Sequence, residues 1–171
     1  MLTGKEIAAR VKAGLITIEP FNEANLSPNS YDLTLASKLL VYTDPVLDPK
    51  RNNASTEITI PDEGFLLRPG ELYIGSVNEL TEAKDLVGVL HGKSSLGRLG
   101  LMVHITAGFI DNGYRGKITL ELAAIKPIRV YANMKIAQLA YSEVTGEVTQ
   151  YKGKYQGDER AEASKSFKDF K

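Results

Sequence analysis

The segment His91–Leu101, HGKSSLGRLGL, concentrates hydrogen-bond donors between two apolar runs. Gly92 and Gly97 allow the backbone to approach a ligand closely. Arginine and lysine give charge-assisted hydrogen bonds to phosphates, and hydroxyls add neutral donors. The GxxxxGK[ST] sequence of a P-loop is missing, so these residues alone predict either an anion site or a polar surface loop. The donors are Lys93, Ser94, Ser95 and Arg98.

A second candidate lies in His104–Gly116, HITAGFIDNGYRG, where Asp111 stands close to Gly113 and Tyr114. A carboxylate can accept a hydrogen bond from a sugar hydroxyl while an aromatic ring packs against the sugar. Asp and Asn also initiate many ordinary turns. Taken by itself, this segment favours the ordinary turn.

The third candidate is the alternating segment Lys117–Ala123, KITLELA. In a strand, alternate side chains point to opposite faces, which groups Thr119, Glu121 and Ala123 on one face and the three apolar residues on the other. If the first face is solvated, Glu121 is an ordinary surface residue. If it lines a cleft, Glu121 is a carboxylate with small neighbours that leave room for a ligand, and it is suited to proton transfer.

Short elements must position these candidates. Leu2–Leu15 is predicted as a helix that begins with a capping box of Thr3 and Glu6 and ends at Gly14. Its buried face is expected to carry Ile7, Val11 and Leu15. After it, many short alternating runs separated by turn residues predict a sandwich or barrel. The expected strands are Tyr31–Leu35, Leu39–Tyr42, Glu57–Ile60, Leu72–Val77, Leu86–Leu90, Met102–Thr106, Lys117–Ala123, Ile128–Tyr131 and Ile136–Val144.

The length and composition of the chain exclude several classes of protein and of binding site. A chain of 171 residues is expected to form one domain. Its 21 basic and 21 acidic side chains balance, which argues against a broad nucleic-acid or membrane-binding surface. No apolar run approaches the roughly 20 residues that span a bilayer, and the charged start MLTGKEIAAR is unlike a signal peptide. We therefore expect a cytoplasmic protein. With no cysteine and two histidines, a zinc site is not expected.

The order of the segments resembles the dCTP deaminase family, a branch of the trimeric dUTPase-like nucleotide enzymes. The resemblance covers nearly the whole chain, and the combination of its motifs is specific. It is carried by IEPFNEANLSPNSYDLTL, HGKSSLGRLGL, HITAGFID, GKITLEL, MKIAQL and KYQG. It implies a mainly β, distorted β-barrel or jelly-roll-like fold with an N-terminal helix and a few short helices.

The resemblance also implies an activity. Family members hydrolyse the exocyclic amine of dCTP without zinc, giving dUTP and ammonia, and assemble as homotrimers with active sites between subunits. By this resemblance Glu121 takes a proton from the attacking water, and Ser94 and Arg98 position that water. Mg²⁺ would be bound through the triphosphate. The residues expected to bind the nucleotide are Lys93, Ser94, Ser95, Arg98, Thr106, Ala107, Asp111, Tyr114, Gln138, Tyr151, Lys154, Tyr155 and Gln156.

The polar segment from Tyr151 to Lys171 is expected to act as a C-terminal lid on a single domain of residues 1–171, rather than as a frayed terminus. Lid closure would exclude water and complete the phosphate contacts. Its stretch GDERAEAS is more acidic than a lid over phosphates would suggest. Another departure from the family pattern is Ala132-Asn133, where Pro-Gly is common.

Two other activities fit the same residues. Some relatives are bifunctional and also cleave the triphosphate, releasing dUMP, ammonia and pyrophosphate. Asp111 could then orient a second water toward the α-phosphate, and the small Gly108 resembles those members. A non-catalytic nucleotide-binding regulator is a weaker alternative, because Glu121, Ser94 and Arg98 are all present. The main expectation from the sequence is the deaminase that releases dUTP.

Overall fold

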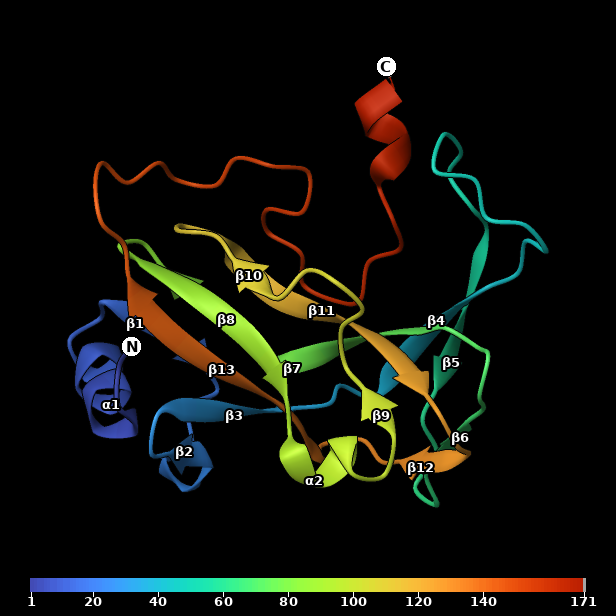
Figure 1. The fold of residues 1–171 in the computed structure, drawn as a ribbon, viewed down its shortest axis with the longest axis horizontal. Helices are drawn as coiled ribbons and strands as arrows, with labels where there is room; N and C mark the ends of the chain where they lie inside the picture. The colour runs from blue at the N-terminus through green and yellow to red at the C-terminus, as the bar shows by residue number, and fades with distance from the viewer. Residues whose placement is uncertain (171) are drawn as a thin grey trace.

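The computed structural model describes residues 1–170, in which short strands dominate (Figure 1). Helix α1 (Gly4–Lys12) begins as predicted, since the Thr3 hydroxyl accepts a hydrogen bond from the Glu6 amide at 3.2 Å. Gly14 follows the helix with a φ of 71°. The prediction that Leu15 lies on the buried face is wrong: it is 62% exposed, because the helix ends before it.

The first sheet is built around the long strand β7 and has the order β5-β4-β7-β11-β9, with all pairs antiparallel. Strand β1 also pairs with β7, at the end of β7 that β4 does not reach. The bounds are β1 (Ile16–Glu19), β4 (Lys38–Tyr42), β5 (Ser55–Thr59), β7 (Tyr73–Ala83), β9 (Leu101–Met102) and β11 (Arg115–Ala124).

The second sheet has the order β10-β8-β13-β3-β2, and two further strands, β6 and β12, pair with each other. Helix α2 (Ser94–Gly97) directly follows β8, and the 3-10 turns are η1 (Glu23–Asn25) and η2 (Ser166–Phe170). The remaining bounds are β2 (Leu26–Ser27), β3 (Ser30–Thr34), β6 (Phe65–Leu67), β8 (Leu86–Gly92), β10 (Phe109–Ile110), β12 (Ile128–Val130) and β13 (Lys135–Glu143).

Both sheets contribute to one apolar core. Leu33 of β3, Leu90 of β8 and Leu139 of β13 are buried in the same cluster as Leu120 and Leu122 of β11. The opposite face of β11 is half-buried along its length, as the alternating sequence predicts. The core therefore fixes which face of β11 can carry functional side chains.

The prediction of a mainly β fold with an N-terminal helix is confirmed. Within residues 1–170 the strand pairings form open sheets and do not close into a ring. The strand expected over Met102–Thr106 is wrong beyond Met102, because the chain leaves β9 there to form a loop. The turn at Ala132-Asn133 is retained, and Asn133 adopts a φ of 63° in place of glycine. No helix in the described part of the chain is long and apolar enough to cross a membrane.

The core contains two fully buried tyrosines that differ in one respect. The Tyr141 hydroxyl has no hydrogen-bond partner within the described residues, whereas the Tyr31 hydroxyl accepts a hydrogen bond from the Asn22 amide at 2.9 Å. Removing a bonded hydroxyl costs about 1 kcal/mol, and removing an unpaired one costs nothing or is stabilising. We therefore expect Tyr141→Phe to keep or raise the free energy of unfolding and Tyr31→Phe to lower it. Urea denaturation at equal protein concentration measures both. A loss of more than about 1 kcal/mol in Tyr141→Phe would contradict the unpaired hydroxyl.

Candidate active site

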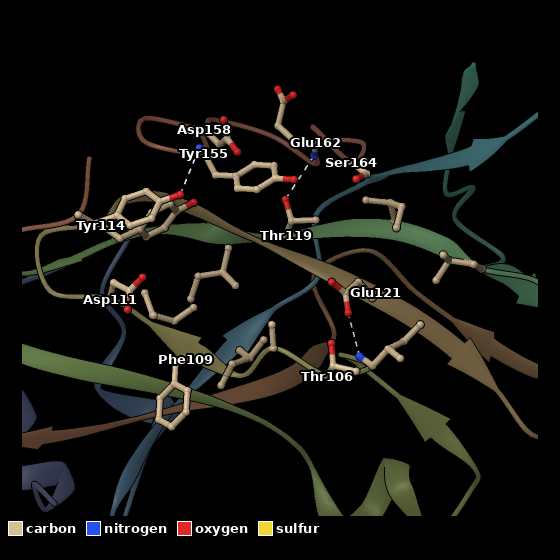
Figure 2. Close-up of a pocket in the computed structure, with 18 of the residues that line it drawn as sticks. Thr106, Phe109, Asp111, Tyr114, Thr119, Glu121, Tyr155, Asp158, Glu162 and Ser164 are labelled. Carbon is tan, nitrogen blue, oxygen red and sulfur yellow. Dashed lines mark hydrogen bonds between the residues drawn. The ribbon is translucent and has the colours of Figure 1, made fainter. Parts of the chain in front are cut away.

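A pocket of about 600 Å³ opens over the half-buried face of β11 (Figure 2). The loop after β9, strand β10 and the C-terminal segment form much of its wall, and β4, β7 and β8 also contribute side chains. Thus the pocket joins three parts of the chain that the sequence analysis considered separately. The lining residues most relevant to chemistry are Thr106, Ala107, Asp111, Tyr114, Thr119, Glu121, Tyr151, Tyr155, Asp158 and Glu162.

Glu121 is bonded to the loop that follows β9 in two ways. Its backbone amide donates to the Val103 carbonyl at 3.0 Å, and its carboxylate oxygen Oε2 accepts a hydrogen bond from the Ile105 amide at 2.8 Å. Figure 2 shows this carboxylate directed toward the loop beside Thr106. The loop therefore holds one carboxylate oxygen in place while Thr106 and Ala107 line the pocket beside it. A carboxylate held in this way can exchange a proton with a water bound against the loop.

Asp111 and Tyr114 belong to the turn between β10 and β11. The Tyr114 amide donates to the Asp111 carbonyl at 3.0 Å, which closes the turn. The Tyr114 hydroxyl donates to the Lys117 carbonyl at 3.1 Å, and its ring meets Tyr151 edge-on at 5.8 Å. Burial raises the pKa of Tyr114 well above its ordinary value, so the phenol remains a neutral donor. This leaves Asp111 as the exposed carboxylate at this side of the pocket.

The C-terminal segment lies along β11 and the turn before it. The Tyr151 amide donates to the Asn112 carbonyl at 2.7 Å, and the Lys117 amide donates to the Asp158 carbonyl at 2.7 Å. The Gln156 side chain accepts a hydrogen bond from the Arg115 amide at 2.8 Å. With these bonds in place, Tyr151 and Tyr155 line the pocket. Lys154 pairs with Asp169 instead, and neither it nor Gln156 lines the pocket. Lys171 lies outside the described residues.

The other predicted residues form a second group that does not line this pocket. Helix α2 lies at the lower edge of Figure 1, apart from β10 and the C-terminal segment. Its residues Ser94 and Ser95 are exposed, as is Arg98. These residues, with Lys93 and Gln138, are therefore separate from Glu121 within one chain.

An ion pair holds Lys93 in place. Its ammonium lies 2.6 Å from the carboxylate of Asp32, a buried residue of β3 whose other oxygen is 3.4 Å from Lys135. Close by, the Gln138 side chain donates to the Gly92 carbonyl and accepts from the Ser30 hydroxyl, both at 3.2 Å. This group is thus an ordered polar surface beside α2.

Several pocket residues were not identified from the sequence. The two-residue period placed Thr119 on the face of Glu121, but the sequence analysis did not name it as a site residue. Its hydroxyl accepts a hydrogen bond from the Glu162 amide at 3.3 Å. Asp158, Glu162 and Ser164 gave no signal, because nothing local in the sequence shows that this segment returns to β11.

Comparison with known proteins identifies the family. A sequence model of the family described as dCTP deaminase-like matches residues 1–144. The chain belongs to this dCTP deaminase-like family. Proteins named "dCTP deaminase, dUMP-forming" from Hathewaya histolytica and Leptospira biflexa are each 49% identical to it, over 99% of this chain and 99% and 98% of their own lengths. A solved dCTP deaminase from Agrobacterium tumefaciens has a TM-score of 0.67 at 22% identity, covering 84% of this chain and 48% of that one, and it supports the fold.

These comparisons correct one expectation. The sequence analysis favoured a deaminase that stops at dUTP, and this main expectation is wrong. The relatives that match the chain over their whole length are named as dUMP-forming. Both products begin with the same loss of ammonia, so the residues of the deamination step do not separate them. The findings favour the alternative, in which the triphosphate is also cleaved.

The packing of the C-terminal segment depends on a glycine in β11. A Cβ atom at Gly116 would lie 2.8 Å from the Asp158 carbonyl oxygen and 2.7 Å from the Tyr114 hydroxyl. We therefore expect Gly116→Ala to displace the segment and to speed tryptic cleavage after Lys152, Lys154 and Arg160. Limited proteolysis followed by mass spectrometry measures this. Gly97→Ala, whose Cβ meets nothing within 4 Å, is the matched control. Equal cleavage rates in both variants would show that the segment does not pack on Gly116.

Proposed function

We propose that this protein is a bifunctional dCTP deaminase that converts dCTP to dUMP, ammonia and pyrophosphate. The observation that carries the proposal is that Glu121 and Asp111 line the same pocket, one beside an ordered loop and the other at the exposed end. The names of relatives that are 44–49% identical over the full length support the product.

The first reaction is hydrolytic deamination. Water bound between Glu121 and the loop at Thr106 and Ala107 attacks C4 of cytosine, and Glu121 takes its proton. Glu121 passes this proton to the ring nitrogen N3 and then moves the remaining proton of the new C4 hydroxyl to the departing amine, so that ammonia leaves and the C4 carbonyl of uracil forms. The hydrogen bond from the Ile105 amide orients the carboxylate throughout. General base catalysis of this kind contributes about 10²- to 10⁴-fold to the rate.

The second reaction is cleavage of the triphosphate. Asp111 orients a second water toward the α-phosphate, the bond to the bridging oxygen breaks, and pyrophosphate leaves dUMP behind. The same carboxylate accepts a hydrogen bond from the sugar 3′-hydroxyl. The sugar would lie beside the Tyr114 and Tyr151 rings, which pack against each other. In this proposal Asp111 therefore both positions the nucleotide and serves the second step.

The charges of the pocket support an assembly of several chains. Within residues 1–170 the lining includes four carboxylates and no lysine or arginine, although the substrate carries a triphosphate. Carboxylates repel phosphates at short range, so the cations must come from elsewhere. We propose a homotrimer in which Lys93, Ser94, Ser95, Arg98 and Gln138 reach the pocket of a neighbouring subunit. Ser94 and Arg98 also position the attacking water, while Lys154 and Gln156 belong to the closing lid.

Magnesium fits this arrangement as a partner of the substrate. The described residues hold no group of three or more His, Asp or Glu side chains that could bind a metal ion on their own. We propose that Mg²⁺ neutralises the triphosphate and keeps most of its coordination positions for water. The complex of dCTP and Mg²⁺ would be taken from the cytoplasm, and no nucleic acid or membrane takes part.

Product analysis tests the two chemical roles. The purified protein is incubated with dCTP and Mg²⁺, and nucleotides, ammonia and pyrophosphate are measured. Wild type is expected to give dUMP with equal amounts of ammonia and pyrophosphate. Glu121→Gln should bind dCTP but release ammonia about 10²- to 10⁴-fold more slowly. Asp111→Asn should release ammonia and accumulate dUTP. Tight dCTP binding without turnover in wild type would support a regulator instead.

Mixing two inactive variants tests the shared site. Chains with Glu121→Gln and chains with Arg98→Ala are unfolded together in equal amounts and refolded. If each site takes these residues from two subunits, every mixed trimer has about one intact site in three, so about a quarter of all sites are intact and a quarter of the wild-type activity should return. Each variant refolded alone is the control. Activity no higher than in the controls would place both residues in one chain's site.

A further inference from the structure

We propose that Lys165 is a positioning residue that fastens the C-terminal segment over the pocket and neutralises the acidic side chains the segment brings there. Lys165 does not line the pocket itself and was not identified from the sequence. The inference rests on the proposed function for its effect on catalysis, and on the geometry alone for its effect on the segment.

Lys165 contacts two carboxylates of the pocket wall. Its ammonium lies 2.9 Å from Asp158 Oδ1 and 3.2 Å from Glu162 Oε2. Asp158 is 8% exposed and its carbonyl accepts from β11, while the Glu162 amide donates to Thr119, two residues before Glu121. Lys165 therefore connects two of the points at which the segment is attached to β11.

Lys165 also fixes the aromatic wall. Its backbone amide donates to the Tyr155 hydroxyl at 2.9 Å, and its ammonium lies 5.3 Å from the centre of the Tyr155 ring. The next bond along the chain runs from the Ser164 amide to the Tyr42 hydroxyl of β4 at 2.8 Å. The segment is thus also attached to β4, next to the residue that holds the Tyr155 ring in the pocket wall.

The positive charge of Lys165 reduces the repulsion between the acidic side chains of the C-terminal segment and a bound triphosphate. Without Lys165, Asp158 would have no ion pair within residues 1–170 and Glu162 would keep only Arg160 at 3.9 Å, so both carboxylates would add negative charge to a pocket for a triphosphate. Partial burial lowers the pKa of Lys165, but the hydrogen bonds to Asp158 and Glu162 outweigh this and raise it overall. The ammonium therefore stays charged at neutral pH and cancels part of the repulsion.

The test compares wild type with three full-length variants, and one double variant is then added to check the effect of charge. Lys165→Met removes the charge and keeps the length of the side chain, and Lys165→Arg keeps the charge. Lys168→Met is the matched control, because Lys168 is an exposed lysine of the same segment. Hydrogen exchange at the amides of Lys117, Gly157 and Glu162 reports attachment of the segment, and steady-state kinetics with dCTP and Mg²⁺ reports catalysis.

In Lys165→Met we expect these amides to exchange their hydrogens faster than in wild type. We expect KM for dCTP to rise about tenfold, because two partly exposed ion pairs are lost. The value of kcat should change less than twofold. Lys165→Arg should restore KM, and Lys168→Met should match wild type. Adding Glu162→Gln to Lys165→Met should lower KM part of the way back to the wild-type value, because one of the two negative charges is removed. Unchanged exchange in Lys165→Met would overturn the inference. So would unchanged KM, or a KM that Lys165→Arg fails to restore.

The two proposals fail in different ways. If wild type releases no ammonia from dCTP, the proposed function is wrong, and hydrogen exchange in the four proteins still decides whether Lys165 fastens the segment. If wild type is active and exchange in Lys165→Met equals that in wild type, the proposed function stands and the role of Lys165 is wrong.

Discussion

Strand β11 packs against the apolar core on one face and lines the pocket with the other, and the site depends on this constraint. Leu120 and Leu122 fill the core between the sheets, which leaves Thr119 and Glu121 on the opposite face. That face is also the surface to which the loop after β9 and the C-terminal segment are bonded, through Glu121 and Thr119 respectively. The same side chains that line the pocket therefore hold its walls together. A change in the register of β11 would remove the core and the site together.

The pocket is acidic, although the family's ligand is anionic. Part of this charge is neutralised inside the chain, by Lys165, and part lies next to the proposed catalytic atoms. Cations suited to phosphates occur on a separate surface beside α2, where Lys93 is already ordered. In the proposed trimer the pocket supplies the general base and the surface beside α2 supplies the phosphate donors, so that each would form half of a nucleotide site. This division of charge explains how a chain with no net charge could bind a triphosphate only after assembly.

The sequence predicts those features that depend on local periodicity. The helix start at Thr3, the alternation of β11 and the mainly β fold follow from spacing alone. Strands β1, β2, β6 and β10 have no more than four residues each, too few for a period to be recognised. The return of Asp158 and Glu162 to β11 depends on hydrogen bonds of single backbone amides between segments about 40 residues apart, which the local sequence pattern does not encode. The product could not be settled either, since both activities share the deamination residues.

The buried carboxylate of Asp32 has a consequence for how Lys93 could bind a phosphate. Free lysine samples many rotamers, and ordering it costs up to about 2 kcal/mol. In this fold that entropy is lost during folding, because Asp32 already holds the Lys93 ammonium at 2.6 Å. In the proposed trimer an incoming phosphate would meet a preorganised donor rather than a mobile one. The fixed Lys93 ammonium would then bind phosphate from a defined direction, as the planar guanidinium of an arginine does because of its shape.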